Sequence, residues 1–296
     1  MGVRGPLARG QAGQARKYTV GMILSFSPIS ENATAPVLML VLPSAVALIA
    51  YAAAILLPGR FVNGLRAALL IAWVAHATAI VIDVAGIGSE STAARFGFAP
   101  ALSVTVWLVL AVYVVETRFV ALPGVRRTLA LIGMAVVVLA WLFPGELRAQ
   151  LPSRWIPLHW AMGIASYGLF GAAVLHSVIL SRAERQMRRA TAPSAGMPLL
   201  RLERLTFSFV TAGFVVLTAA LLLGAWFANP WRWDHKTVFS MLGWVVFASL
   251  LAGRRAFGWR GPRATRWVYA GAALLLLAYV GSRFVLEVLL QRPPGA

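Results

Sequence analysis

The sequence predicts an all-α, polytopic integral membrane protein with about eight transmembrane helices. Of its 296 residues, 60% are hydrophobic and only 12% are charged, and the mean hydropathy of +0.78 is outside the range of ordinary soluble domains. Long apolar runs bounded by charge recur along nearly the whole chain, and a bilayer core of about 30 Å needs roughly 20 apolar residues per helix. The runs are unbroken and do not alternate every second residue, which favours helices over barrel strands.

Eight apolar runs, taken in chain order, are the predicted spans. The first, second, fifth, sixth and eighth runs reach the roughly 20 residues that a span needs, and the third is a little shorter. The fourth run is the shortest, and the seventh is only slightly longer. The runs are 36–57, 67–87, 99–116, 128–143, 156–180, 206–228, 237–253 and 267–290.

The chain is expected to form one membrane domain, residues 36–290, between an N-terminal extension of residues 1–35 and a short tail of residues 291–296. Residues 1–21 are rich in Gly and Arg, contain no apolar run and carry four positive charges. Because those charges fall on the side predicted to be outside, we expect a start codon assigned too early, with Met22 as the true initiator. The extension is expected to be partly disordered.

The net charge of +18 would suggest nucleic acid as a partner in a soluble protein, but here the basic residues sit in short loops between spans. The odd-numbered loops hold 16 Lys or Arg and the even-numbered loops hold 5. The positive-inside rule therefore makes the odd loops cytoplasmic and places both termini outside. The expected location is a bacterial inner (plasma) membrane, with no nucleic-acid partner.

The chain has no cysteine, which excludes thiol relays, Fe–S clusters, thiolate-ligated haem and Cys-type zinc sites. Phosphate-binding loops, zinc-protease helices and nucleophile elbows are also missing from the sequence. The expected function is therefore binding or assembly rather than classical catalysis, and any thiol chemistry must come from a partner.

Four histidines are candidate ligands. Placing an ionisable group at membrane depth costs free energy, so a histidine there is a candidate for a functional role. His159 opens the fifth run about one turn below the outer surface, and His235 lies in the outer loop before the seventh run, so topology brings both to one face. His76 and His176 are candidates for a second, deeper site. His159 and His176 are 17 residues apart on one predicted helix, about 25 Å, and cannot bind one iron together.

The stretch "ANPWRWDHKTVF", residues 228–239, crowds aromatic and charged residues into an apolar chain. Imidazole is a usual axial ligand of haem iron, and a flat macrocycle favours tryptophan faces with Arg or Lys beside its propionates. An interfacial aromatic belt would use the same tryptophans, so both interpretations stay open on chemistry alone. The residues that provide the haem-binding combination around His235 are Trp226, Trp231, Trp233, Arg232 and Lys236.

The segment "LERLTFSFVTAGFVVLTAALLLGAWFANPWRWDHKTVFSMLGW" resembles the signature region of the cytochrome c assembly protein family, the CcsA- and HemX-like haem-handling membrane proteins. Upstream, "FGFAPALSVTVW" and "PLHWAMGIASYGLF" are also similar to that family, and the resemblance covers roughly residues 60–290. The layout and the C-terminal segment look most similar to its YpjD-like inner-membrane branch. The matching features are Glu203, Gly213-Phe214, Leu217-Thr218, Gly224-Ala225-Trp226, Trp231-x-Trp233-Asp234-x-Lys236 and Trp244.

The resemblance implies a Trp-rich external loop that holds haem, the expected cofactor, for delivery to apocytochrome c. His159 matches the first external ligand, so haem iron would be bound through His159. The last span reads "AYVGSRF" where the family has its second external histidine, and "VVFASLLAGRR" where it has an internal one. His235 stands where the family often has proline and is the candidate substitute.

The first hypothesis is a haem-handling assembly factor that presents haem at the outer membrane face, with Trp231, Trp233 and Asp234 shaping the platform. The alternative is a transporter-associated protein in divalent-cation handling that keeps the fold, with Asp83, Asp234 and the intramembrane histidines as cation contacts. A third is a regulator of haem synthesis or a scaffold that stabilises an enzyme through its cytoplasmic loops, with 181–205 as the expected contact. The expected partners are membrane lipid, haem, cytochrome c maturation proteins or a membrane transport protein.

Overall fold

The computed structural model describes most of the predicted membrane domain. The predicted extension up to residue 33 and the tail 291–296 lie outside the described residues. The chain divides into two compact units, Met1–Met39 and Leu40–Ala296. The described residues are 34–85, 94–117, 125–148, 155–189, 198–227, 233–285 and 288.

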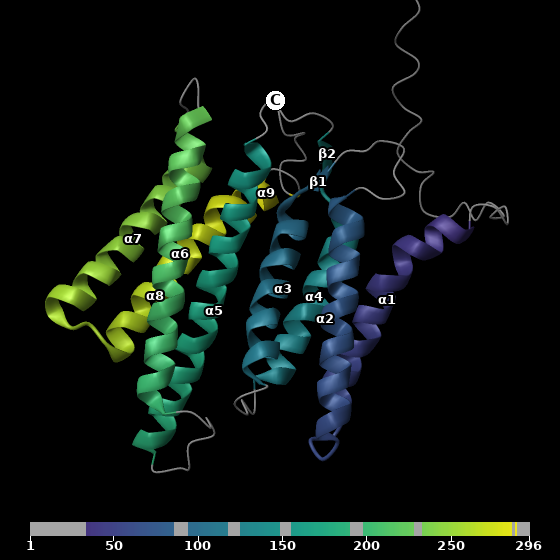
Figure 1. Cartoon of the computed structure of the whole chain (residues 1–296), viewed down its shortest axis with the longest axis horizontal. Coiled ribbons are helices and arrows are strands. Elements are labelled where there is room, and N and C mark those ends of the chain that lie inside the picture. The colour runs from purple at the N-terminus through teal and green to yellow at the C-terminus, as the bar shows by residue number, and fades with distance from the viewer. Residues whose placement is uncertain are drawn as a thin grey trace, which may run out of the picture. The chain divides into compact units, whose positions relative to one another are not determined.

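Each of the eight predicted spans corresponds to a helix, which confirms the all-α fold class (Figure 1). The eighth run continues beyond α8 through a π-helical turn, η2 (Leu277–Gly281), into α9 (Ser282–Phe284). The helices are α1 (Thr34–Leu56), α2 (Val62–Val84), α3 (Phe98–Glu116), α4 (Arg126–Leu142), α5 (Ile156–Arg188), α6 (Leu199–Phe227), α7 (His235–Phe257) and α8 (Gly261–Leu276).

Six helical segments among the described residues are long and apolar enough to cross a membrane, judged by length and composition. They are α2, α3, α5, α6, α7 and the continuous stretch Gly261–Phe284. The part of α1 from Val41 to Leu56 is a shorter apolar helix, and α4 has only 17 residues. The protein is therefore a multi-pass helical membrane protein, and the 17 residues of α4 are at the lower limit of the usual span length.

The connector expected at 181–205 is shorter than predicted, because α5 continues to Arg188 and α6 begins at Leu199. The polar segment "SRAERQMR" is made largely of strong helix formers, so its polarity indicates the end of the apolar run but not the end of the helix. A second difference is a short antiparallel pair, β1 (Ala94–Phe96) with β2 (Glu146–Arg148). Three-residue strands are too short to show a period-2 pattern.

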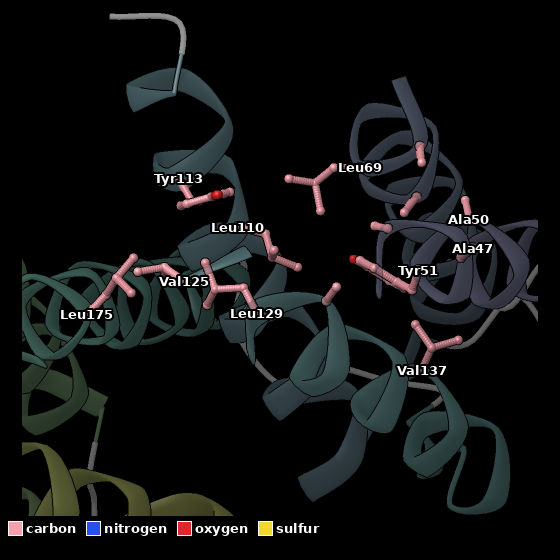
Figure 2. Packing of buried hydrophobic residues seen from close by; sticks show 14 of the residues in the cluster. Ala47, Ala50, Tyr51, Leu69, Leu110, Tyr113, Val125, Leu129, Val137 and Leu175 are labelled. Atoms are coloured by element: carbon pink, nitrogen blue, oxygen red, sulfur yellow. The ribbon is translucent and has the colours of Figure 1, made fainter. Parts of the chain in front are cut away.

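Two buried apolar clusters hold the helices of the second unit together. The first joins α1, α2, α3 and α4 with parts of α5 and α6, and Figure 2 shows Tyr51, Leu110, Leu129 and Leu175 among its members. The second joins α5, α6, α7 and α8. Helices α5 and α6 contribute to both clusters and pack most extensively against each other, so this helix pair is the common element of the unit (Figure 1).

Glycines allow the helices to approach closely at several contacts. A Cβ at Gly133 of α4 would lie 2.7 Å from the Tyr51 ring of α1, and one at Gly271 of α8 would lie 2.6 Å from the Phe247 ring of α7. Phe247 in turn stacks on Phe170 of α5, with ring centroids 3.8 Å apart. Small residues at such contacts are typical of membrane helices, whose association depends on van der Waals packing.

Candidate functional site

A cavity of about 250 Å³ opens where the N-terminal parts of α3, α5 and α7 meet the C-terminal part of α6 and the η2 turn. Its wall includes His159 and Tyr167 of α5, Gly224 of α6, Lys236 of α7 and Tyr279 of η2. These segments are far apart in the sequence and come together because neighbouring helices run in opposite directions. Aromatic, cationic and imidazole groups therefore share one site.

His159 is half-buried in this wall, and its ring is oriented by α6. Its Nδ1 lies 2.9 Å from the carbonyl oxygen of Ala220, and since a carbonyl only accepts hydrogen bonds, Nδ1 carries the donated proton. The lone pair of the neutral ring is then on Nε2. Histidines that bind metals usually donate their other ring N–H to a carbonyl or carboxylate in this way. The arrangement suits an axial ligand.

Gly224 lies one turn after Ala220 on α6 and provides the space for this ring. A Cβ at Gly224 would lie 2.8 Å from Cε1 of His159 and 3.2 Å from its Nδ1. Any side chain at this position would push the ring away from the Ala220 carbonyl. The His159 ring can therefore keep this position only if residue 224 is glycine.

The N-terminus of α7 brings charge to the cavity. Asp234 is the N-cap of α7, and its Oδ1 accepts a hydrogen bond of 2.7 Å from the backbone N–H of Thr237. Lys236 follows within the first turn, and its Nζ lies 5.7 Å from the centroid of the Tyr279 ring. Asp234 and Lys236 both line the cavity, whereas His235 between them is exposed and does not.

Replacing Asp234 by alanine should destabilise the protein by about 1 kcal/mol, the usual effect of losing an N-cap, while asparagine should retain most of the cap.

Burial raises the pKa of Asp234, but the hydrogen bonds from Thr237 and the charges of Lys236 and His235 outweigh it and leave the pKa below its ordinary value. A lowered folded-state pKa stabilises the fold above the unfolded-state value of about 3.9. The stability difference between the wild type and Asp234→Asn should therefore be constant above that pH and shrink as the pH falls through the folded-state pKa. Thermal melts in detergent from pH 3 to 7 measure it, and a pH-independent difference would contradict it.

The tryptophans predicted to form the haem platform lie away from the cavity wall or outside the described residues. Trp226 and Trp233 are 86% and 70% exposed, and neither lines the cavity. Trp231 and Arg232 lie outside the described residues. The tryptophan that does line the cavity is Trp160, which follows His159 in the first turns of α5.

The structure does not bring His76 and His176 into a shared site. His76 lies in α2, with Nδ1 3.0 Å from the Tyr51 hydroxyl and Nε2 2.8 Å from the Ser103 hydroxyl. His176 contacts Glu116, and Ser103 and Glu116 are 13 residues apart on α3, about 20 Å. His76 borders a second cavity of about 280 Å³, which Asp83 also lines.

Tyr279 and Gly224 are site residues whose role the sequence did not reveal. Tyr279 lies within "AYVGSRF", the part of the last span where the family has its second external histidine, and its aromatic hydroxyl is the sequence feature that could have indicated a site there. Gly224 belongs to the matched motif, but nothing in the motif names the ring that it faces. Tyr167, whose hydroxyl donates to the Leu275 carbonyl, links α5 to the end of α8 at this cavity.

Comparison with known proteins adds independent information. The sequence model of the family described as Cytochrome C assembly protein matches residues 61–290. The chain is 30% identical to the inner membrane protein YpjD of Escherichia coli over 227 residues, which cover 74% of this chain and 85% of that protein. It is 25% identical to the cytochrome c biogenesis protein CcsA of Prochlorococcus marinus over 201 residues, 55% of this chain and 64% of that protein.

The cytochrome c biogenesis protein CcsA of a Synechococcus strain is also 25% identical, over 195 residues that cover 54% of this chain and 64% of that protein. The matched region thus spans just under two thirds of the length of both CcsA relatives and most of the length of YpjD. No solved structure matches the chain.

Proposed function

The chain belongs to the cytochrome c assembly protein family, and from that premise we propose that it handles haem in cytochrome c maturation, binding it in the cavity around His159. The observation that carries the proposal is the His159 ring, whose Nδ1 is committed to the Ala220 carbonyl while Nε2 has the lone pair. Membership in the family supports the haem-handling role. In this proposal, haem is cargo to be presented, not a resident catalyst.

The residues present fit such a group. His159 offers one imidazole nitrogen, which is a common axial ligand of haem iron. Lys236 lines the same cavity and is suited to pair with a propionate, since an ammonium binds a carboxylate as a point charge. The apolar lining includes Leu217 and Leu221 of α6, which suits the face of a macrocycle, and a cavity of about 250 Å³ would enclose only part of it. Bound haem would supply an iron centre with open coordination chemistry, and this chain would hold, orient and shield it.

We propose that the cavity faces the outside of an inner membrane. The N-terminal ends of α3, α5 and α7 share that face with the cavity, and the distribution of Lys and Arg over the loops predicts that these ends are outside. A relative described as an inner membrane protein matches over most of its length. Apocytochrome c and the proteins that reduce its thiols are then the expected partners at that surface, because this chain contains no cysteine.

The proposal is tested with the full chain, purified in mild detergent from haem-sufficient cells and measured by visible spectroscopy and a pyridine haemochrome assay. We expect a Soret band with a haem content approaching one per protein. The matched control is the same protein from haem-starved cells, which should regain the band when haem is added. No band under either condition would overturn the proposal and favour the divalent-cation alternative, for which binding of Mg²⁺ would then be measured by calorimetry.

Replacing Gly224 by alanine should weaken haem binding at least about tenfold, as expected when an outer partner of a metal ligand is disturbed. The new Cβ would occupy the space of the His159 ring and break its bond to Ala220. The matched control is Gly163→Ala, because Gly163 lines the same cavity but a Cβ there meets nothing within 4 Å. Haem titration measures both, and equal affinities would contradict the steric role of Gly224.

A further inference from the structure

A buried polar pair joins α3 to α5, separate from the cavity. His176 of α5 is 0% exposed, and Glu116, the last residue of α3, has a side chain that is 15% exposed. The Nε2 of His176 lies 2.9 Å from Oε1 of Glu116. His176 is 17 residues beyond His159 on α5, about 25 Å, so the pair belongs to a different part of the molecule.

The hydrogen-bond partners fix how many protons the pair holds. Nδ1 of His176 lies 2.8 Å from the carbonyl oxygen of Ala172, one turn earlier, and a carbonyl can only accept. Nδ1 therefore carries a proton, and in a neutral ring Nε2 would present its lone pair. An ionised carboxylate also presents only lone pairs. A contact of 2.9 Å between Nε2 and Oε1 requires one further proton between them.

We infer that His176 and Glu116 form a proton-binding site, in which one proton taken from water is held between Nε2 of the imidazole and Oε1 of the carboxylate. Two forms satisfy the geometry: an imidazolium beside a carboxylate, and a neutral imidazole beside a carboxylic acid. Both contain the same bound proton and the same net charge of zero. When the proton leaves to water, two lone pairs face each other in a buried place, which is unfavourable.

The pair has apolar cover on one side and polar atoms beside it. The ring of Phe209 on α6 lies 5.1 Å from the His176 ring and covers it with apolar surface. Among the described residues, Oε2 of Glu116 and Oγ of Ser177, which follows His176 on α5, are buried polar atoms that lack hydrogen-bond partners. The positive charge of Arg126 at the start of α4 acts on Tyr113, one turn before Glu116 on α3, and a positive charge there favours the form of the pair with an ionised carboxylate.

The site has a structural consequence for the unit. The protonated pair bonds α3 to α5, the helix that also carries His159. The deprotonated pair would repel along the same line. Contact between α3 and α5 at this position is therefore linked to the proton, and the natural ligand of this second site is a proton rather than a metal or haem, since both nitrogens of His176 are already hydrogen-bonded.

The inference is tested on the full chain in detergent with histidine labelled by ¹⁵N in its ring. The His176 signals are identified by their absence in His176→Gln. At pH 7 we expect either a protonated Nε2 in the ¹⁵N spectrum or a carboxylic-acid C=O band in the infrared spectrum. That band, if present, should be lost in Glu116→Gln, and a ¹³C label on glutamate assigns it in the wild type if the variant does not fold.

Glu116→Gln is the matched variant because its amide N–H can donate to an unprotonated Nε2. This variant should keep the hydrogen bond and show a neutral His176 ring with an unprotonated Nε2. Relative to the wild type, either the ¹⁵N signal of Nε2 should shift or the carboxylic-acid band should be lost. A bare Nε2 in the wild type together with no acid band from Glu116 would overturn the inference. This outcome is independent of whether the cavity around His159 binds haem.

Discussion

His159→Ala is expected to lose nearly all bound haem, with an affinity at least about 100-fold below that of the wild type. The loss should exceed the 10–100-fold effect of disturbing an outer partner, because the variant removes the proposed ligand itself. His159 is the described histidine that lines the cavity, and its ring is held by Ala220 and Gly224. The measurement is a haem titration of the purified full chain followed by its Soret band.

The matched control is His235→Ala. His235 is close to the cavity in the sequence of α7 but is exposed and does not line it, so its removal should leave the affinity within about threefold. Equal losses in both variants would show that His235 also serves as a ligand. No loss in His159→Ala would contradict the proposed role of His159, even if the wild type carries haem.

Phe247→Ala is expected to destabilise the protein by about 3–5 kcal/mol, the cost of removing a large buried aromatic side chain. Phe247 is 0% exposed, stacks on Phe170 of α5 and packs against Gly271 of α8, so the truncation would leave a cavity between three helices. Thermal unfolding in detergent, followed by intrinsic fluorescence, measures the loss.

Val245→Ala is the control on the same helix, because Val245 is 52% exposed in the middle of α7. Surface substitutions away from caps and cores usually change stability by less than about 0.5 kcal/mol. Similar melting temperatures for the two variants would show that the α5–α7–α8 contact contributes little to stability.

The fold class could be predicted from the sequence because a bilayer imposes one dominant requirement, a long apolar run for every span. All eight runs became helices, and the largest error was at the junction of α5 and α6, where polar residues continue a helix beyond its apolar part. The β1–β2 pair was missed because short loop strands depend on contacts between segments that are distant in sequence. The hydropathy pattern indicates whether a segment is surrounded by lipid or by water more directly than it indicates whether the backbone is helical.

The site was harder to predict, because a motif names residues without their partners. Thr218 and Trp244 both belong to the matched motif, and the structure shows the Trp244 Nε1 donating to the Thr218 hydroxyl at 2.9 Å, a link between α6 and α7. Glu203 of the same motif pairs with Arg260 at 3.4 Å. Some motif residues thus have packing roles, whereas Gly224 orients His159, and only the spatial contacts distinguish these cases.

The length of α5 has an electrical consequence. Its 33 residues span about 50 Å, so roughly 20 Å of the helix extends past a hydrocarbon core of about 30 Å. Three arginines lie along this projecting part, one at every third residue: Arg182, Arg185 and Arg188. From Arg182 to Arg188 the helix axis rises about 9 Å, which is about one screening length at physiological ionic strength. The projecting part of α5 therefore spreads its positive charge along the helix axis instead of gathering it at one depth.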